Sequence, residues 1–200
     1  MPPLCRPRHC PKVIFKMSKI QTCYGKIHPA VFARLSKIKL LVLDVDGTLT
    51  DGGIYLDNSG LEFKRFNTKD GYGIVALQKS GVKCAVITGR NSELVRRRCT
   101  DELKMEYVIQ GHADKGPELT KLRDSLELAV FEVAALGDDM NDLPLFRNSG
   151  FSACPADAAS FIRSTADLVL RSRGGHGAAR ELCDLIMMAH GSLNPDGSIV

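Results

Sequence analysis

Four short motifs in this 200-residue chain carry the residue types that phosphate chemistry needs. They are DVDGT with Asp44 and Asp46, ITGR with Thr88, the isolated Lys115, and GDDMND with Asp138. Carboxylate oxygens such as those of Asp44 and Asp138 are hard ligands that suit Mg²⁺. A hydroxyl and an ammonium group can hold phosphate oxygens. A carboxylate in line with phosphorus can attack it to form an aspartyl phosphate, while a second one protonates the departing alcohol and then activates water.

The spacing of Asp44 and Asp46 also has a geometric meaning. Residues i and i+2 of a strand share one face, so both carboxylates can address the same phosphate. Backbone N–H groups in the glycine-containing turn that follows can cradle phosphate oxygens. Four apolar residues precede the first aspartate in the stretch LLVLDVDGT, and a fifth, Val45, lies between the two acids. The motif therefore indicates a site at the tip of a buried strand.

Buried strands alternate with helices along most of the chain, and this order predicts how the motifs meet. Apolar runs predict strands over 40–45, 82–88, 107–109, 133–136, 150–153 and 168–170. Cap residues and periodicity predict helices over 71–80, 91–101 with Asn91 as its cap, 115–128, 141–148, 156–164 and a last helix containing 178–189. Such alternation predicts an α/β fold with a doubly wound, Rossmann-like parallel sheet. Ligands bind at the carboxyl ends of such strands, so we expect the four motifs to converge on one edge.

Composition and charge exclude several classes of protein. The chain is 44% hydrophobic and 25% charged, as an ordinary globular protein is. Residues 1–43 hold nine of the 27 Lys and Arg and none of the 23 Asp and Glu, so the net charge of +4 comes from this segment. Residues 1–38 lack the features of a nucleic-acid binder, and no apolar run approaches the ~20 residues of a membrane span. Seven cysteines without a CxxC pair predict reduced thiols and a cytoplasmic protein.

The four motifs, taken in order, resemble those of the haloacid dehalogenase superfamily of phosphohydrolases. The resemblance implies that Asp44 is the nucleophile and that Asp46 is the general acid and base. It implies Mg²⁺ on the Asp44 carboxylate, the Asp46 backbone carbonyl and the Asp138 carboxylate. Thr88 and Lys115 would hold the phosphate.

Two further aspartates of the GDDMND stretch would have supporting roles by the same resemblance. Asp142 would assist the metal or Lys115, and Asp139 would assist the site or only support its loop. The chain is predicted to divide into a basic N-terminal arm or extension (1–37), from its charge, a phosphatase core (38–191), from the resemblance, and a flexible C-terminal end (192–200), from its sequence. Met17 is a plausible true start.

A finer resemblance covers nearly the whole chain from Met17 onward. The stretches DGGIY, FNTKDGYGI, VRRRC, GDDMNDLP and RGGHGAARELCDLI resemble the 3-deoxy-D-manno-octulosonate 8-phosphate phosphatase family. The resemblance implies a capless, Mg²⁺-dependent homotetramer that acts on this sugar-acid phosphate in lipopolysaccharide precursor synthesis. It implies that Asp46 and Lys115 contact the substrate together with residues of a sugar-acid site, which are Asn67, Thr68, Lys69, Asp70, Gly71, Arg90 and Arg98.

The two arginines suit a substrate that carries a carboxylate as well as a phosphate. Arg90 and Arg98 are eight residues apart, which places them two turns along one face of the predicted helix. Either guanidinium could hold the carboxylate in a bidentate pair. Val75 departs from the family, in which a longer basic residue is common, so one substrate contact could be missing.

Little sequence is available for a cap domain over the site. The segment between Asp46 and Val82 holds a predicted hairpin, with strands over 54–56 and 61–66 around the turn 57–60, and one helix. An isolated hairpin is marginal in water, so we expect it to protrude after the first strand and to pack against other copies. The glycine segment 171–181 resembles the family's mobile tail, which reaches a neighbouring subunit's site.

Two alternatives to this function stay open. A nine-carbon sugar-acid 9-phosphate phosphatase would share the scaffold, but it tends to have glutamate where Arg90 stands. A non-catalytic oligomerisation module would be expected to have decayed motifs, whereas all four are intact here.

Overall fold

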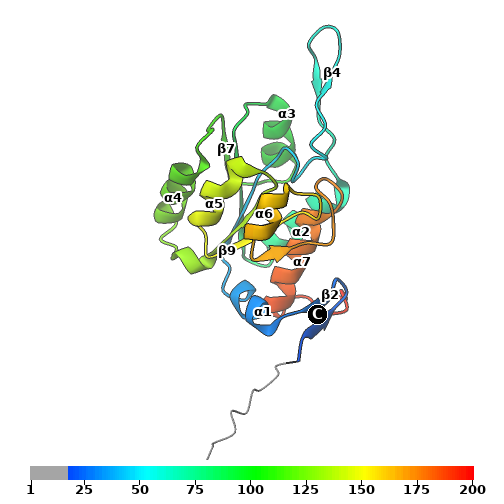
Figure 1. The fold of residues 1–200 in the computed structure, drawn as a ribbon, viewed down its shortest axis with the longest axis vertical. Coiled ribbons are helices and arrows are strands. Elements are labelled where there is room, and N and C mark those ends of the chain that lie inside the picture. Colours follow the sequence, from blue (N-terminus) through cyan, green and yellow to red (C-terminus); the bar gives the residue numbers. More distant parts are fainter. Residues whose placement is uncertain (1–17) are drawn as a thin grey trace, which may run out of the picture.

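A parallel six-stranded sheet forms the centre of the computed structural model, which describes residues 18–200 (Figure 1). Its strands lie in the order β10-β9-β8-β3-β6-β7. Their bounds are β3 Leu40–Leu43, β6 Lys83–Thr88, β7 Tyr107–Gln110, β8 Val133–Leu136, β9 Phe151–Cys154 and β10 Leu168–Val169. All four residues of β3 are buried, as expected of a strand covered on both faces. The doubly wound α/β fold predicted from the sequence is confirmed.

Helices cover both faces of this sheet. One face carries α2 Thr68–Lys79, α3 Glu93–Arg96 with the π-helical turn η1 Arg97–Glu102, and α7 Ala178–His190. The other carries α4 Lys115–Ser125, α5 Leu143–Arg147 and α6 Ser160–Thr165. Successive side chains of β3 point to opposite faces of the sheet and so belong to two different cores. Leu41 and Leu43 pack with the first group of helices, while Leu40 and Val42 pack with the second. Short 3₁₀ turns, η2 Val130–Glu132 and η3 Met140–Asp142, flank β8.

The N-terminal part of the described chain is folded, unlike the basic arm predicted for residues 1–37. Two short antiparallel strands, β1 Ile20–Thr22 and β2 Gly25–Ile27, lead into α1 Pro29–Leu35. Ile27 and Leu35 are buried in the same cluster as α7. Few apolar positions are enough to dock this segment, and its basic composition obscured them. The proposed start at Met17 lies outside the described residues.

The C-terminal end also makes defined contacts, although a frayed end was predicted for residues 192–200. Leu193 pairs with Ile199 across a turn. The backbone N–H of Cys23 donates a hydrogen bond of 2.7 Å to the Pro195 carbonyl, which joins this end to the β1–β2 turn. Over residues 18–200, no helix is both long and apolar enough to cross a membrane.

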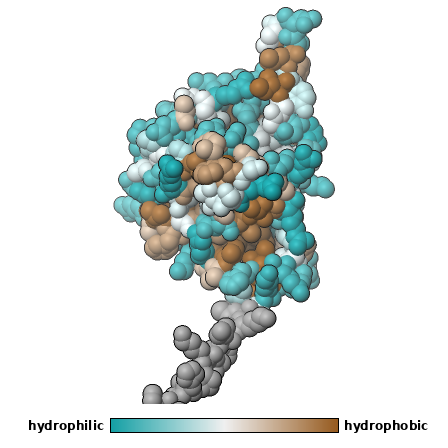
Figure 2. Space-filling view, in the orientation of Figure 1, coloured by the Kyte–Doolittle hydropathy of each residue, from teal (hydrophilic) through white to brown (hydrophobic). Residues whose placement is uncertain are grey.

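A hairpin projects from the body of the molecule, as predicted (Figure 1). Its strands β4 Tyr55–Leu56 and β5 Glu62–Phe63 are antiparallel and shorter than expected. Asp57 stabilises the turn by accepting hydrogen bonds from the Ser59 and Leu61 backbone N–H groups. Apolar side chains are exposed along the hairpin and form part of the hydrophobic surface in Figure 2; they are Ile54, Tyr55, Leu56, Leu61 and Phe63.

Four helix starts differ from the prediction. The α5 and α6 helices begin at Leu143 and Ser160, later than the predicted 141 and 156, and α2 and α3 differ as well. The α2 helix begins at Thr68, three residues early, because the Asn67 side chain caps it by accepting from the Lys69 N–H. The α3 helix begins at Glu93, so Asn91 is not its cap. The Ser92 N–H instead donates to the side chain of Gln110 at the end of β7.

Candidate active site

The carboxyl ends of the three central strands bring the predicted motifs together. Leu43, the last residue of β3, pairs with Val86 of β6 and Leu136 of β8. Asp44 follows Leu43 directly, while Thr88 and Asp138 lie two residues beyond those two partners. The predicted convergence on one edge of the sheet is therefore present for these residues.

Lys115 is the centre of the buried cluster at this edge. It is the first residue of α4, after β7, and its side chain is 0% exposed. Its Nζ donates to Asp44 Oδ1 at 2.6 Å and to Asp142 Oδ1 at 2.6 Å. The other oxygen of Asp142 accepts from the Asp138 and Asp139 backbone N–H groups. Asp142 thus fixes both the lysine and the loop that carries Asp138.

The carboxylates of this cluster repel one another in a dry environment. Burial raises the pKa of Asp44 to about 8, with repulsion from Asp142 adding to the effect and Lys115 opposing it. Burial raises the pKa of Asp138 to about 7, and Asp142 again adds to it. Burial alone would lower the pKa of Lys115, but Asp44 and Asp142 outweigh it and raise that pKa. The lysine therefore stays charged beside more carboxylates than it can neutralise.

This donor set fits a divalent cation. Asp44, Asp138 and Asp142 each offer an oxygen, and these atoms lie within 4.8 Å of one another. Hard oxygen ligands of this kind suit Mg²⁺, whose charge would offset the repulsion. Gly47 allows the approach of Asp138: its φ is +88°, and an added Cβ would lie 2.1 Å from Asp138 Oδ2. Thr48 donates to Asp138 Oδ1 at 3.1 Å and orients it.

The predicted general acid and base contacts a residue that the motifs did not reveal. Asp46 follows β3 on the loop, and its carboxylate contacts the ammonium group of Lys64. Lys64 comes directly after β5, so the base of the hairpin reaches the site. The signal in the sequence is the alternation Glu62, Lys64, Phe66, which places three side chains on one face of an extended segment.

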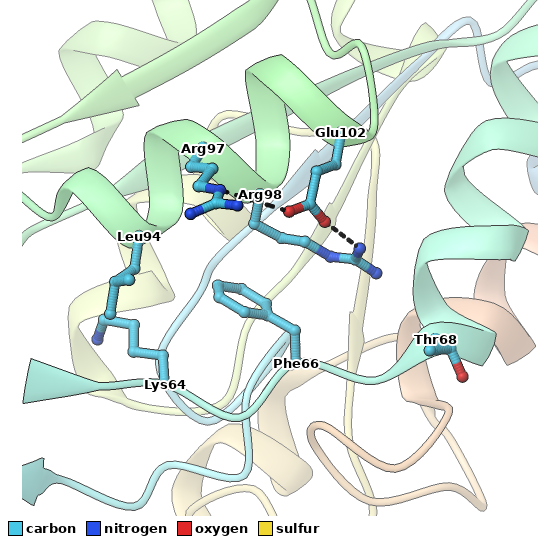
Figure 3. A pocket seen from close by; sticks show the side chains of 7 residues that line it. All are labelled: Lys64, Phe66, Thr68, Leu94, Arg97, Arg98 and Glu102. Carbon is cyan, nitrogen blue, oxygen red and sulfur yellow. Dashed lines mark hydrogen bonds and ion pairs between the residues drawn. The ribbon is translucent and has the colours of Figure 1, made fainter.

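A cavity of about 320 Å³ lies beside this contact. Figure 3 shows its lining side chains, which come from the hairpin base, the start of α2 and the α3–η1 segment. They are Lys64, Phe66, Thr68, Leu94, Arg97, Arg98 and Glu102. Two residues of the predicted sugar-acid site, Thr68 and Arg98, are therefore on the cavity wall.

The remaining residues predicted for the sugar-acid site are placed differently. Arg90 precedes α3, so it does not share a helix face with Arg98, and the two-turn argument is wrong. The Arg90 guanidinium donates to Glu62 at 2.7 Å, whereas Arg98 donates to Glu102 at 2.7 Å. Lys69 is exposed at the start of α2. Val75 packs partly against the core and is not among the residues that line the cavity.

Asp70 and Gly71 act inside the protein in this structure. Asp70 is buried, and its carboxylate accepts from the Gly177 and Arg180 backbone N–H groups at the start of α7. Burial raises its pKa, against the effect of these hydrogen bonds. At Gly71 an added Cβ would lie 2.4 Å from Arg98 Nη2, so the glycine leaves room for that guanidinium.

The glycine segment before α7 lies against the DVDGT loop of its own chain. The Gly175 N–H donates to the Thr48 carbonyl at 2.9 Å, and Asn67 Nδ2 donates to the Gly175 carbonyl at 3.1 Å. An added Cβ on Gly174 would lie 1.8 Å from the Gly47 carbonyl oxygen, which only glycine can accommodate. Asp139 caps η3 by accepting from the Met140 N–H at 2.7 Å, a contact that supports its loop.

Comparisons with known proteins show which family this chain resembles in sequence and fold. A family model described as haloacid dehalogenase-like hydrolase matches residues 102–182. The 3-deoxy-D-manno-octulosonate 8-phosphate phosphatase of Escherichia coli K12 is 42% identical over 88% of this chain and 94% of its own. The crystal structure of the Yersinia pestis phosphatase of the same name has a TM-score of 0.86 and 40% identity, covering 92% of this chain and 99% of its own. The Moraxella catarrhalis phosphatase was solved with magnesium ion, phosphate ion and KDO; it has a TM-score of 0.79 and 38% identity, with coverages of 82% and 93%.

Proposed function

The chain belongs to the 3-deoxy-D-manno-octulosonate 8-phosphate phosphatase family of haloacid dehalogenase-like hydrolases, and we propose that it hydrolyses this sugar-acid phosphate to the free sugar acid and phosphate. One observation carries the proposal: the ammonium group of buried Lys115 bonds both Asp44 and Asp142, next to Asp138. This arrangement suits a phosphate and a divalent cation. The product would enter lipopolysaccharide precursor synthesis in the cytoplasm.

Asp44 and Asp46 divide the chemistry between them. A carboxylate oxygen of Asp44 attacks phosphorus, the ester P–O bond breaks, and the departing sugar oxygen takes a proton from Asp46. Water then attacks the phosphorus of the aspartyl phosphate and gives its proton to Asp46, which releases phosphate and restores Asp44. Lys115 holds Asp44 in place, and Lys115 and Thr88 bind phosphate oxygens.

Mg²⁺ is the cofactor of the proposed reaction. The Asp44 and Asp138 carboxylates and the Asp46 backbone carbonyl would hold it, while Asp142 and Asp139 support the loop. When bound, the ion neutralises charge on the phosphate and on the carboxylates around it. The buried carboxylate cluster described above supports this assignment.

The cavity beside Asp46 supports a sugar acid as the departing group. Arg98 and Thr68 on its wall offer donors to a carboxylate and to hydroxyl groups. In the proposal, Asn67, Lys69 and Arg90 complete the site for the sugar acid. Arg90 favours the eight-carbon substrate over a nine-carbon 9-phosphate.

We further propose that the active form is a homotetramer assembled through the hairpin. Its exposed apolar residues support this, since a protruding apolar hairpin is costly in water. The idea that the glycine segment before α7 reaches a neighbouring subunit's site stays a prediction, because its contacts described here are within one chain.

Phosphate release from the eight-carbon and nine-carbon sugar-acid phosphates, with Mg²⁺ or with EDTA, tests the function. We expect rapid release from the eight-carbon substrate that needs Mg²⁺ and that Asp44→Asn lowers by more than about 1,000-fold, because the nucleophile is lost. Asp124→Asn, at an exposed carboxylate on α4, is the matched control and should keep full activity. Equal turnover of both substrates would contradict the specificity, and undiminished activity of Asp44→Asn would contradict the mechanism.

A further inference from the structure

Lys64 has no role in the reaction steps given above, although it contacts the proposed general acid and base. Its side chain is 2% exposed, and its ammonium group contacts the Asp46 carboxylate. The same nitrogen lies 3.5 Å from Glu62 Oε1, which also accepts from Arg90. Burying an ammonium group is costly unless it is paired, so the pairing fixes both Lys64 and its acidic partners.

Asp46 benefits from such a partner. Its carboxylate stands on the loop after β3, and 31% of the side chain is exposed. Within the described residues, Lys64 is the hydrogen-bonding partner of this carboxylate. Proton transfer requires the carboxyl oxygen to be within about 2.6–3.2 Å of the departing oxygen. A carboxylate that rotates freely would hold that position only part of the time.

Lys64 also faces the space in which the departing group would lie. It lines the cavity together with Phe66, Thr68, Leu94 and the η1 residues (Figure 3). Lys64 and Phe66 share one face of the extended segment that leaves the hairpin, because they are two residues apart. Lys64 therefore contacts Asp46 and also lines the cavity proposed for the sugar acid.

We propose that Lys64 is a positioning residue that holds the Asp46 carboxyl group toward the ester oxygen. The inference rests on the proposed phosphatase activity and adds the hairpin base to its site. As the ester P–O bond breaks, its electron pair stays on the departing oxygen, which receives the proton of Asp46. Lys64 itself exchanges no proton. A departing group that is stable as an anion does not need this proton.

Activity on two different phosphate esters distinguishes this positioning role from a purely structural one. In Lys64→Met we expect kcat/KM for the sugar-acid phosphate to fall by at least about 30-fold, within the range that general acid catalysis contributes. For p-nitrophenyl phosphate the expected fall is less than about threefold, because p-nitrophenolate leaves without a proton. The ratio kcat/KM reports the steps up to the departure of the alcohol or p-nitrophenolate. The later hydrolysis of the aspartyl phosphate therefore does not affect it. Lys64→Arg keeps the cation and should recover most of the loss.

Arg65→Met is the matched control. Arg65 is the next cation along the same segment, half exposed, and it contacts Asp51 at 3.6 Å. Its loss should change kcat/KM for either ester by less than about twofold, because surface substitutions usually have small effects. Equal losses on both esters in Lys64→Met, or no loss on either, would overturn the proposal, provided that the thermal midpoint shows a folded protein. If wild type proves inactive on the eight-carbon substrate, the proposed substrate fails, and the comparison is then made with the alkyl phosphate that it does hydrolyse.

Discussion

At the scale of residues, the cluster of Asp44, Asp138 and Asp142 around Lys115 links metal binding to stability. The pKa of Asp44 is raised to about 8 and that of Asp138 to about 7, both from an ordinary value of 3.8. Without metal, the folded protein therefore binds more protons than the unfolded chain between about pH 4 and 8. These two groups lower the free energy of unfolding as the pH rises through that window. Mg²⁺ binds the deprotonated carboxylates and so offsets this decrease in the free energy of unfolding.

We therefore expect Mg²⁺ to raise the thermal midpoint more at pH 8 than at pH 5.5. At a concentration about 100 times its Kd, a ligand stabilises by about 2.7 kcal/mol, or roughly 5–10 °C for a chain of this size. Asp138→Asn removes one charge, so it should raise the midpoint in EDTA at pH 8 and reduce the Mg²⁺ shift. Differential scanning calorimetry in EDTA and in Mg²⁺ measures both. A Mg²⁺ shift that is the same at both pH values and in the variant would contradict this account.

The sequence could predict the parts of the site that lie at strand ends. Asp44, Thr88 and Asp138 follow buried strands, and the topology of a parallel sheet is enough to bring them together. Lys64 was missed because it belongs to a hairpin whose position in space depends on tertiary contacts. Asp70 was assigned to the substrate by resemblance, yet its backbone partners at residues 177 and 180 are more than a hundred positions away.

At the scale of elements, the strands of the sheet could be predicted from the sequence, but the first residue of the helix α2 could not. The helix was predicted to begin at Gly71, whereas α2 begins at Thr68 and holds Gly71 and Gly73, although glycine is unfavourable inside helices. Gly73 lies under α7, where an added Cβ would be 3.0 Å from the Arg180 Cα. Close packing of two helices explains this glycine, and periodicity within one segment cannot reveal it. The segment 18–37 was likewise hidden by its charge.

The α1 helix is attached to the edge of the sheet by one ion pair, which gives an element-scale prediction. Arg34 donates to Asp167 at 2.6 and 2.8 Å and to the Gly150 carbonyl at 2.6 Å. Burial would raise the pKa of Asp167, but its hydrogen bonds with Arg34 and Ser152 outweigh burial and lower it. This carboxylate therefore stabilises the fold above about pH 4, and its contribution is lost as the pH falls through the lowered pKa.

Arg34→Met should lower the free energy of unfolding by about 1 kcal/mol at pH 7, because the pair is partly exposed but bidentate. The deficit should be smaller at an acid pH below the lowered pKa of Asp167, because this carboxyl group is then protonated in both proteins. Urea unfolding at the two pH values measures it. Lys121→Met, which removes an exposed ion pair within α4, is the control and should change stability by less than about 0.5 kcal/mol. A deficit that is independent of pH would show that Arg34 acts through packing and its bond to the Gly150 carbonyl, and not through Asp167.

At the scale of the whole molecule, the hairpin is the feature that a single chain leaves unexplained. It extends beyond the body in Figure 1, and Figure 2 shows apolar surface along it, where its exposed apolar residues lie. Its base meanwhile contributes Lys64 and Glu62 to the surroundings of Asp46 and Arg90. Packing of several hairpins would bury the apolar residues along their strands and hold the bases still, so assembly and catalysis are expected to depend on each other.

Phe63→Lys tests this dependence, because a charge at that position is costly to bury in an interface. We expect wild type to sediment at four times 21.8 kDa and the variant to dissociate, with at least about a tenfold lower kcat/KM. Phe161→Lys is the matched control, since Phe161 on α6 is 56% exposed and Phe63 is 54% exposed. The control should stay tetrameric and active. A dissociated Phe63→Lys protein with full activity would separate assembly from catalysis, and a wild-type monomer would leave the exposed hairpin without the partner proposed for it.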